Sequence, residues 1–156
     1  MSLTYFSRGN IYISKKEYEK AIYDYTQVLN YNPNYTDAYY NRGCLYNLTG
    51  EIEKASSDFN RILEINPNYA EAYYNIGNIY SLSGEFNKAI SNYNQILGFK
   101  PDHAEAHYNR GIAYGNTGEP NKAIYDFTQA LKTNPNYTEA YNNRGIAYAS
   151  KGEFDK

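Results

Sequence analysis

The chain has 156 residues, 42% of them hydrophobic, which is enough apolar material for one continuous core. Its formal charge of -2 provides no basic field for nucleic acid, and no apolar run approaches the roughly 18 residues that cross a bilayer. A single cysteine excludes an internal disulfide, and no Cys/His cluster has zinc-site spacing. The N-terminus has no charged segment followed by an apolar one. We therefore expect a cytoplasmic protein with no nucleic acid, membrane, metal ion or cofactor among its ligands.

A fixed step of 34 residues organises the sequence, beginning with the prolines Pro33, Pro67, Pro101 and Pro135. The same step relates glycines, tyrosines, alanines and aromatic residues, which are Gly9, Gly43, Gly77, Gly111 and Gly145; Tyr12, Tyr46, Tyr80, Tyr114 and Tyr148; Ala21, Ala55, Ala89 and Ala123; and Tyr25, Phe59, Tyr93 and Phe127. A period of this length indicates a solenoid of stacked supersecondary units.

Each unit predicts two helices, here called helix A and helix B. In the second unit, apolar residues recur at helical spacing over residues 37–48, which predicts helix A. Asn34, with an acid three residues later, is expected to cap its start. Gly50 is expected to end it in the left-handed conformation, a role that falls to Lys16 in the first unit. Helix B is predicted to begin at Glu51 and to cross helix A most closely where Ala55 meets the repeat glycine.

The order aromatic residue, Gly, Tyr, Ala, aromatic residue, Pro resembles the tetratricopeptide repeat family over essentially the whole chain. The resemblance implies an all-α fold, a right-handed α-α superhelix (solenoid) of helix-turn-helix repeats. We expect repeats at 2–35, 36–69, 70–103 and 104–137, and a partial fifth at 138–156 that holds helix A and the start of helix B. We interpret the partial repeat as a cut through a longer array; docking on another copy of the chain is the alternative.

Arginine precedes the repeat glycine in three of the complete repeats, where the family commonly has Leu. Each of these arginines has an acid 16 residues later in helix B, giving the pairs Arg8 with Asp24, Arg42 with Asp58, and Arg110 with Asp126. The third repeat has Ile76 and Asn92 instead. Because the two charges occur together and disappear together, we predict an Arg–Asp ion pair inside each of these three hairpins. The alternative is a basic stripe for an acidic ligand.

The resemblance also implies a concave face, lined by the A helices, that holds extended peptide segments. Side chains expected there form the predicted peptide-binding set Asn41, Asn75, Asn109, Asn143, Tyr40, Tyr74, Tyr108, Asn10 and Asn78. An amide both donates and accepts, so a ladder of asparagines can pair with a peptide backbone of any sequence. It is similar to the asparagine ladder of O-linked N-acetylglucosamine transferases. The alternative interpretation is that these asparagines are only tolerated on a solvent-exposed face and bind no ligand.

Acids at the groove edge favour neutral or basic ligands, and they are Asp37, Glu71, Glu105 and Glu139. His103 and His107 have the spacing of a metal pair, but both stand where other repeats have Tyr, and no third ligand recurs nearby. Cys44 has no His or Lys fixed beside it, as a nucleophile would need. We therefore predict a scaffold or adaptor without enzymatic activity, which binds a peptide or a partner's helix. A solenoid that self-assembles as a homodimer through its C-terminal half-repeat, and an accessory domain of a larger enzyme, stay open.

Overall fold

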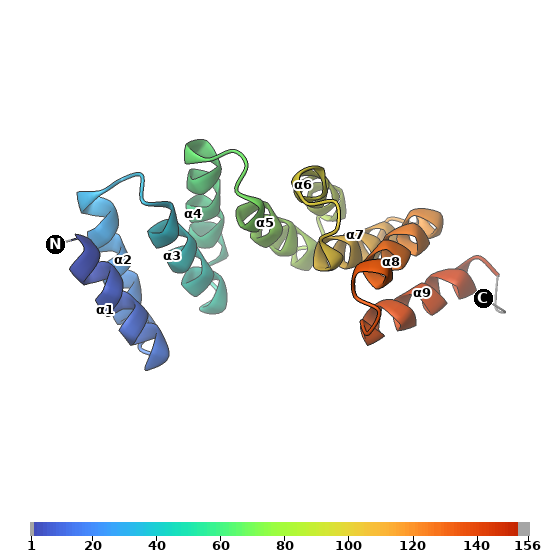
Figure 1. Ribbon diagram of the computed structural model, residues 1–156, viewed down its shortest axis with the longest axis horizontal. Coiled ribbons are helices and arrows are strands. Elements are labelled where there is room, and N and C mark those ends of the chain that lie inside the picture. The colour runs from blue at the N-terminus through green and yellow to red at the C-terminus, as the bar shows by residue number, and fades with distance from the viewer. Residues whose placement is uncertain (1, 153–156) are drawn as a thin grey trace. The chain divides into compact units, whose positions relative to one another are not determined.

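The computed structural model describes residues 2–152, which form α-helices joined by turns and contain no β-strand, as the predicted all-α fold requires (Figure 1). The helices are α1 (Ser2–Ser14), α2 (Tyr18–Tyr31), α3 (Thr36–Leu48), α4 (Ile52–Ile65), α5 (Ala70–Leu82), α6 (Phe86–Phe99), α7 (Ala104–Asn116), α8 (Pro120–Thr133) and α9 (Thr138–Ser150). Odd-numbered helices are the A helices of the repeats and even-numbered ones the B helices. The predicted start of helix B in the fifth repeat lies outside the described residues.

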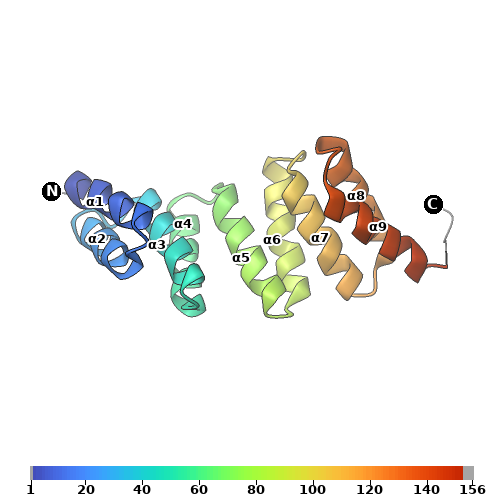
Figure 2. The same ribbon diagram turned by 90° about the horizontal axis from the view of Figure 1, so that it is seen from below.

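The chain divides into two compact units, Met1–Ala72 and Tyr73–Lys156. In the first unit, α1 packs on α2, α2 on α3, and α3 on α4, and Figure 2 shows the helices of each pair side by side. The buried core there is made by Ala21, Tyr25, Val28, Leu29, Ala38 and Leu45. Each hairpin thus buries its apolar stripe against its neighbour along the chain.

The second unit repeats this packing. In it α6 contacts α7, α7 contacts α8, α8 contacts α9, and α7 also reaches α9. Two small clusters form the buried core between α8 and α9, made by Ala123, Phe127 and Ala147 and by Ala130, Leu131 and Ala140. None of the helices in residues 2–152 combines the length and apolar character that crossing a membrane requires.

The repeat glycine sets the closest approach within a hairpin. A Cβ atom added to Gly43 would lie 2.9 Å from Phe59 Cε1 and 3.3 Å from Asp58 Cβ. The expected tight crossing at Gly43 is therefore confirmed, with Phe59 and Asp58 as the nearest residues of helix B, and Ala55 is fully buried. Gly9, Gly77 and Gly111 meet the aromatic ring of their own helix B in the same way.

The turn between helices A and B is also as expected. Gly50 has a φ of 83°, and Lys16 takes the left-handed conformation with a φ of 59°. Glu51 is the residue that precedes α4 rather than its first helical residue. Its side chain makes no cap hydrogen bond but pairs with Lys54, one turn into the helix, at 2.5 Å.

The predicted cap of helix A is wrong. The residue before α3 is Tyr35, and no side chain caps the helix there. Asn32, which precedes Pro33, instead accepts a hydrogen bond from the Asn34 backbone N–H at 3.3 Å. An asparagine that bonds two residues ahead stabilises a turn. The loop thus uses a different asparagine from the expected one, and the helix begins two residues after Asn34.

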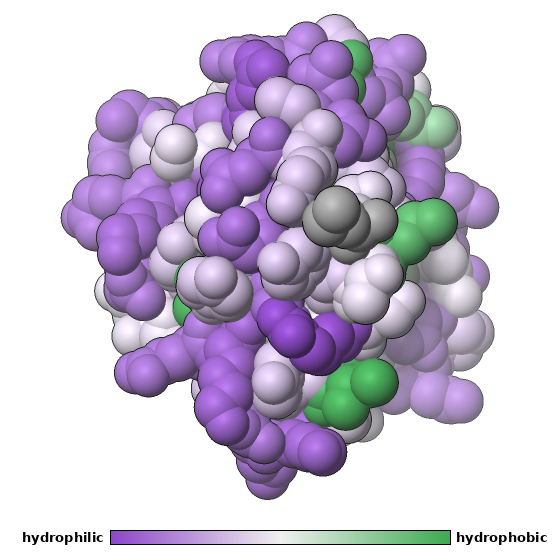
Figure 3. Space-filling view, turned by 90° about the vertical axis from the view of Figure 1, so that its left-hand side faces the viewer, coloured by the Kyte–Doolittle hydropathy of each residue, from purple (hydrophilic) through white to green (hydrophobic). Residues whose placement is uncertain are grey.

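Most of the surface drawn in Figure 3 is hydrophilic, with hydrophobic residues in small separate areas. In the first unit, the large hydrophobic side chains that are exposed include Leu3, Ile11 and Leu48. Scattered exposed hydrophobic residues are normal for a protein surface, so they do not mark a binding site on their own.

Candidate functional site

The structure brings together each arginine and aspartate that the sequence pairs. In the second repeat, Arg42 Nε and Nη2 donate to the two carboxylate oxygens of Asp58 at 2.8 and 2.7 Å. The same two-bond geometry joins Arg8 to Asp24 and Arg110 to Asp126, at 2.6 to 2.7 Å. The three aspartates are buried, and short charge-assisted bonds hold the guanidinium groups against them. The Arg42 and Arg110 side chains are mostly buried, whereas the Arg8 side chain is about half exposed.

The third repeat replaces this pair by unrelated contacts. Ile76 is buried at the arginine position, and Asn92 at the aspartate position donates to the Lys88 carbonyl oxygen at 2.9 Å. Because the third repeat lacks both the arginine and the aspartate, it has no buried charge without its partner at these two positions.

The two histidines have structural partners. His107 is buried, with Nδ1 2.9 Å from Asp126 Oδ1 and Nε2 2.8 Å from the Pro101 carbonyl oxygen. Both ring nitrogens of His107 thus face oxygen atoms of the chain itself. His103 Nδ1 accepts from the Ala106 backbone N–H at 3.2 Å. Within residues 2–152 no three His, Cys, Asp or Glu side chains gather to hold a metal ion.

The predicted ladder begins in the first unit with a cluster on α1, α2 and α3. The buried Tyr25 hydroxyl donates to Asn10 Oδ1 at 2.6 Å. Asn41 Nδ2 lies 3.4 Å from the same oxygen and 3.4 Å from the Tyr25 hydroxyl oxygen. Burial raises the pKa of Tyr25 to about 12. Asn10 and Asn41 are thus brought together around a tyrosine of helix B.

The second unit builds the same cluster on α5, α6 and α7. The Tyr93 hydroxyl donates to Asn78 Oδ1 at 2.8 Å. Asn109 Nδ2 donates to Asn78 Oδ1 at 3.0 Å and to the Tyr74 hydroxyl oxygen at 3.2 Å. The Asn109 amide nitrogen is therefore engaged by two acceptors inside the protein.

Further along the second unit, Asn143 Nδ2 on α9 donates to the Tyr108 hydroxyl oxygen on α7 at 2.9 Å. The Tyr108 ring packs on Tyr137 with centroids 4.6 Å apart. Burial, followed by the charge of Glu139, raises the pKa of Tyr108. The two remaining predicted residues, Tyr40 on α3 and Asn75 on α5, are half-buried, and Tyr40 packs on Phe59 and Tyr69.

The sequence prediction missed that tyrosine and asparagine are coupled. Repeats one and three pair a helix B tyrosine with an asparagine after the repeat glycine. Repeats two and four have phenylalanine in helix B, and the residue after their glycine is Cys44 or Ile112. The helix B aromatic residue and the residue after the repeat glycine vary together across the repeats, as arginine and aspartate do, and this covariation is the signal in the sequence that indicates the coupling.

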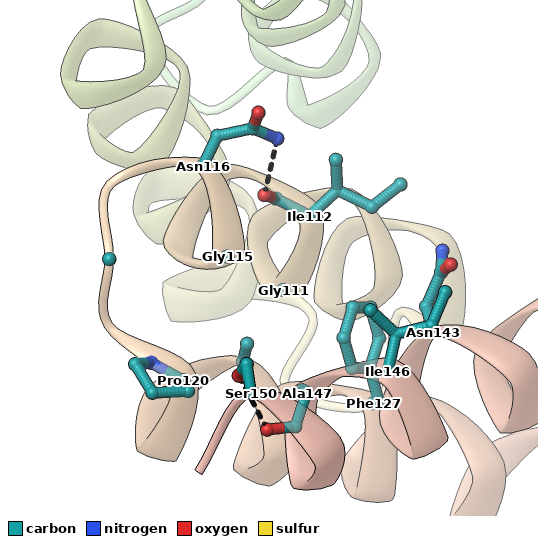
Figure 4. A pocket seen from close by; sticks show the side chains of 12 residues that line it. Gly111, Ile112, Gly115, Asn116, Pro120, Phe127, Asn143, Ile146, Ala147 and Ser150 are labelled. Atoms are coloured by element: carbon teal, nitrogen blue, oxygen red, sulfur yellow. Dashed lines mark hydrogen bonds between the residues drawn. The ribbon is translucent and has the colours of Figure 1, made fainter.

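A pocket of about 520 Å³ was also missed. It lies in the second unit and is lined by Gly111, Ile112, Gly115, Asn116, Gly118, Pro120, Ala123, Phe127, Asn143, Ile146, Ala147 and Ser150. Figure 4 shows the α7 residues Ile112 and Asn116 on one side and the α9 residues Asn143 and Ile146 on another. The phenylalanine and isoleucine of repeat four stand here where repeat three has its tyrosine and asparagine.

Comparison with protein families follows the same period. A family model described as TPR repeat matches residues 9–50 and 77–118, and models described as Tetratricopeptide repeat match 36–69 and 104–137 and also 59–91 and 127–156. The chain belongs to the tetratricopeptide repeat (TPR) family. It is therefore a repeat module of the kind that mediates protein interactions.

Solved TPR structures share this fold. A crystal structure of MamA protein is 27% identical, with a TM-score of 0.92 over 99% of this chain and 84% of that one. MamA from Desulfovibrio magneticus RS-1 is 19% identical, with a TM-score of 0.91 over 98% of this chain and 86% of that one. YrrB, described as a TPR protein with an unusual peptide-binding site, is 21% identical, with a TM-score of 0.85 over 99% and 80%. The search of curated proteins gave no match.

Proposed function

We propose that this TPR chain is a scaffold or adaptor that binds an extended peptide segment along the inner side of its A helices. The observation that carries the proposal is the hydrogen bonding of Asn109 with Tyr74 and of Asn143 with Tyr108. The two asparagines stand at the same repeat position, and so do the two tyrosines. A helix does not need such an Asn–Tyr pair for its own stability. The recurrence of the pair therefore favours a role in ligand binding.

The direction of these bonds defines what each side chain offers. Asn109 donates through Nδ2, so its Oδ1 atom is the group with which it can accept from a ligand N–H. The Tyr74 hydroxyl accepts from Asn109 and keeps its own hydrogen, which can be donated to a ligand carbonyl. One asparagine and one tyrosine together thus match the donor and acceptor of a peptide unit.

The internal bonds also hold the ligand-facing atoms in place. Ordering a free side chain on binding opposes association by about 0.5–1.5 kcal/mol. Asn143 is anchored to Tyr108, which itself packs on Tyr137, so much of this ordering is already present without ligand. Tyrosine adds rigid contact area with few rotatable bonds.

Charge narrows the ligand class. Glu105 and Glu139 stand in the first turns of α7 and α9, on the same helix side as Tyr108 and Asn143. Two arginines adjoin this face in sequence: Arg110 is held by Asp126, and Arg144 donates to the Thr128 hydroxyl oxygen at 3.3 Å. We therefore expect neutral or basic peptides to bind better than acidic ones.

A peptide array tests the proposal with matched asparagine variants. The Asn109→Ala/Asn143→Ala variant should bind array peptides about tenfold more weakly, because about 1 kcal/mol or more is lost as two backbone contacts disappear. Asn92→Ala is the control, since Asn92 lies on α6 and bonds only its own helix. Equal binding by all three proteins, with unchanged melting temperatures, would refute the ladder.

A further inference from the structure

The pocket of the second unit is a local exception to the polar inner face. Its floor is the ring of Phe127, which is 3% exposed, and its walls include Ile112 of α7 and Ile146 of α9. Ile146 is 67% exposed, so a large apolar surface stands open beside the pocket. Figure 4 shows Phe127, Ile112 and Ile146 around the pocket, with Asn143 close to Ile146 on α9.

Two features of the sequence open this space. Gly115 has no side chain, and a Cβ atom added to it would meet no atom within 4 Å. In the preceding repeat, the position of Ile112 is taken by Asn78, whose Oδ1 accepts from both Tyr93 and Asn109. The same part of the inner face is therefore closed by hydrogen bonds at repeat three and open and apolar at repeat four.

The pocket has the size of a side-chain site. A volume of about 520 Å³ lies in the range of roughly 300–1,000 Å³ typical of ligand pockets. A leucine or phenylalanine side chain would cover Ile146, Ile112 and Phe127 at once. Removing that apolar surface from water favours binding. The polar side chains of the lining, Asn116, Asn143 and Ser150, donate to groups of the chain itself.

Charge at the neighbouring end of the face indicates the rest of the ligand. Glu105, Tyr108 and Ile112 follow one another at spacings that place them on one side of α7, as do Glu139, Asn143 and Ile146 on α9. Burial raises the pKa of Tyr137 to about 12, followed by the charges of Tyr108 and Tyr74 and then by those of Glu105 and Glu139. The negative charge at this end complements a basic side chain, and no Lys or Arg lines the pocket.

Helix geometry sets the spacing between the two contacts. Glu105 and Ile112 are seven residues apart, about 10 Å along α7 at 1.5 Å per residue. An extended peptide covers that distance in about three residues at roughly 3.3 Å each. Asn143 and Tyr108 lie between the two ends and can meet the backbone in the middle.

We propose that the pocket between α7, α8 and α9 takes a bulky apolar side chain of an extended peptide, whose basic residue, about three positions away, lies against Glu105 and Glu139. This inference rests on the proposed function and adds side-chain selection to a ladder that reads only backbone. The ligand class is thus a peptide with Lys or Arg followed or preceded at that spacing by Leu, Ile, Met or Phe.

Three capped peptides test the inference by calorimetry or NMR titration. They are Gly-Lys-Ala-Ala-Leu-Ala-Gly, its leucine-to-alanine form, and its lysine-to-glutamate form. The first should bind about tenfold more tightly than the second, because only it fills the pocket, and more tightly than the third. In the NMR titration with the first peptide, the largest changes in chemical shift should occur at Ile112, Gly115 and Ile146 of the protein.

A pair of glycine variants supplies the control on the protein. Gly115→Leu places a side chain in the pocket and should abolish the preference for the leucine peptide over the alanine peptide. Gly98→Leu makes the same change on α6, where an added Cβ also meets nothing within 4 Å, and should leave the preference intact. Both positions are exposed and helical, so both variants should remain folded.

The outcomes separate the two proposals. Equal affinity for the leucine and alanine peptides overturns the pocket inference alone. Failure of all three peptides to bind overturns both it and the proposed function. A dimer of the unmodified protein that Gly115→Leu converts to monomer would mean that a second copy occupies the pocket, which also overturns the peptide inference.

Discussion

Repeats three and four are built on the same backbone pattern yet place their polar groups at different positions of the hairpin. Repeat three has a hydrogen-bonded Tyr93–Asn78 pair and an apolar Ile76 where an arginine could stand. Repeat four has the reverse, with an ion pair of Arg110 and Asp126 and an apolar Phe127 beside Ile112. Side chains are thus exchanged as interacting pairs.

The exchange follows from the energetics of burial. A buried polar or charged group left without its partner destabilises the fold, whereas replacing both members by apolar residues can be nearly neutral. Each repeat can therefore change its chemistry at one location without disturbing the frame, provided both residues change. Phe127 and Ile112 of repeat four, which replace the tyrosine and asparagine of repeat three, line the pocket that we propose as a binding site.

Breaking the ion pair of repeat four should have the largest effect. Asp126→Ala leaves both Arg110 and His107 without their carboxylate, and we expect the free energy of unfolding to fall by about 3 to 5 kcal/mol. Urea denaturation measures this. Asn92→Ala, the equivalent change in repeat three, should alter it by less than about 1 kcal/mol, because Asn92 bonds only its own helix.

Giving repeat four the residues of repeat three is the sharper form of this test. The Arg110→Ile/Asp126→Asn variant should recover most of the stability lost in Asp126→Ala, since no unpaired carboxylate or guanidinium stays buried. A double variant as unstable as Asp126→Ala would show that the two residues do not act as a pair.

Two glycines of α7 provide the next contrast. Gly111→Ala would place Cβ 2.8 Å from Phe127 Cε1, and the displaced ring should lower the free energy of unfolding by about 1 to 2 kcal/mol after the helix-propensity gain. Gly115→Ala, one turn further on, meets nothing and should raise it by about 0.5 to 1 kcal/mol. Thermal unfolding distinguishes the signs; effects of the same sign would contradict the close contact.

The tyrosine–asparagine pair should give a smaller effect that depends on its partner. Tyr93→Phe should lower the free energy of unfolding by about 0.5 to 1.5 kcal/mol, the value of one hydrogen bond. Phe127→Tyr in repeat four should also destabilise, because Ile112 offers no acceptor, and adding Ile112→Asn should restore the loss. Additive effects of the last two changes, measured by urea denaturation, would rule out the coupling.

The period of 34 residues made most of the fold predictable. Proline, glycine and aromatic residues act locally, so helix pairing, the left-handed turn at Gly50 and the crossing at Gly43 followed from sequence alone. The helix cap did not, because Asn32 and Asn34 both suit a turn, and only the path of the loop around Pro33 decides which one is used.

The candidate site was less predictable than the fold. Side chains such as Asn109 could be grouped by their repeat position, but the bonds that use their amide hydrogens could not be foreseen. Those bonds depend on Tyr74 and on Asn78, which stand more than 30 residues earlier in the sequence. The pocket depends on the absence of a side chain at Gly115. Glycine does not recur at this position of the other repeats, so the 34-residue period did not point to it.

Alkaline pH gives the finest test of the contrast, because repeat three has an ionisable hydroxyl where repeat four has none. Burial, followed by the charge of Tyr74, raises the pKa of Tyr93 above the ordinary tyrosine value of about 10. Above about pH 10 the unfolded chain loses this proton while the folded protein keeps it, so stability is present below that pH and falls as pH rises. Between about pH 9 and pH 11 we expect Tyr93 to contribute a fall of about 1 kcal/mol or less in the free energy of unfolding.

Urea denaturation at several pH values tests this contribution. Tyr93→Phe should reduce the fall in the free energy of unfolding by that amount, whereas Phe127→Leu should leave the dependence on pH unchanged. Equal slopes for the native protein and Tyr93→Phe would mean that the hydroxyl of repeat three ionises as freely as an exposed one, which would contradict its burial.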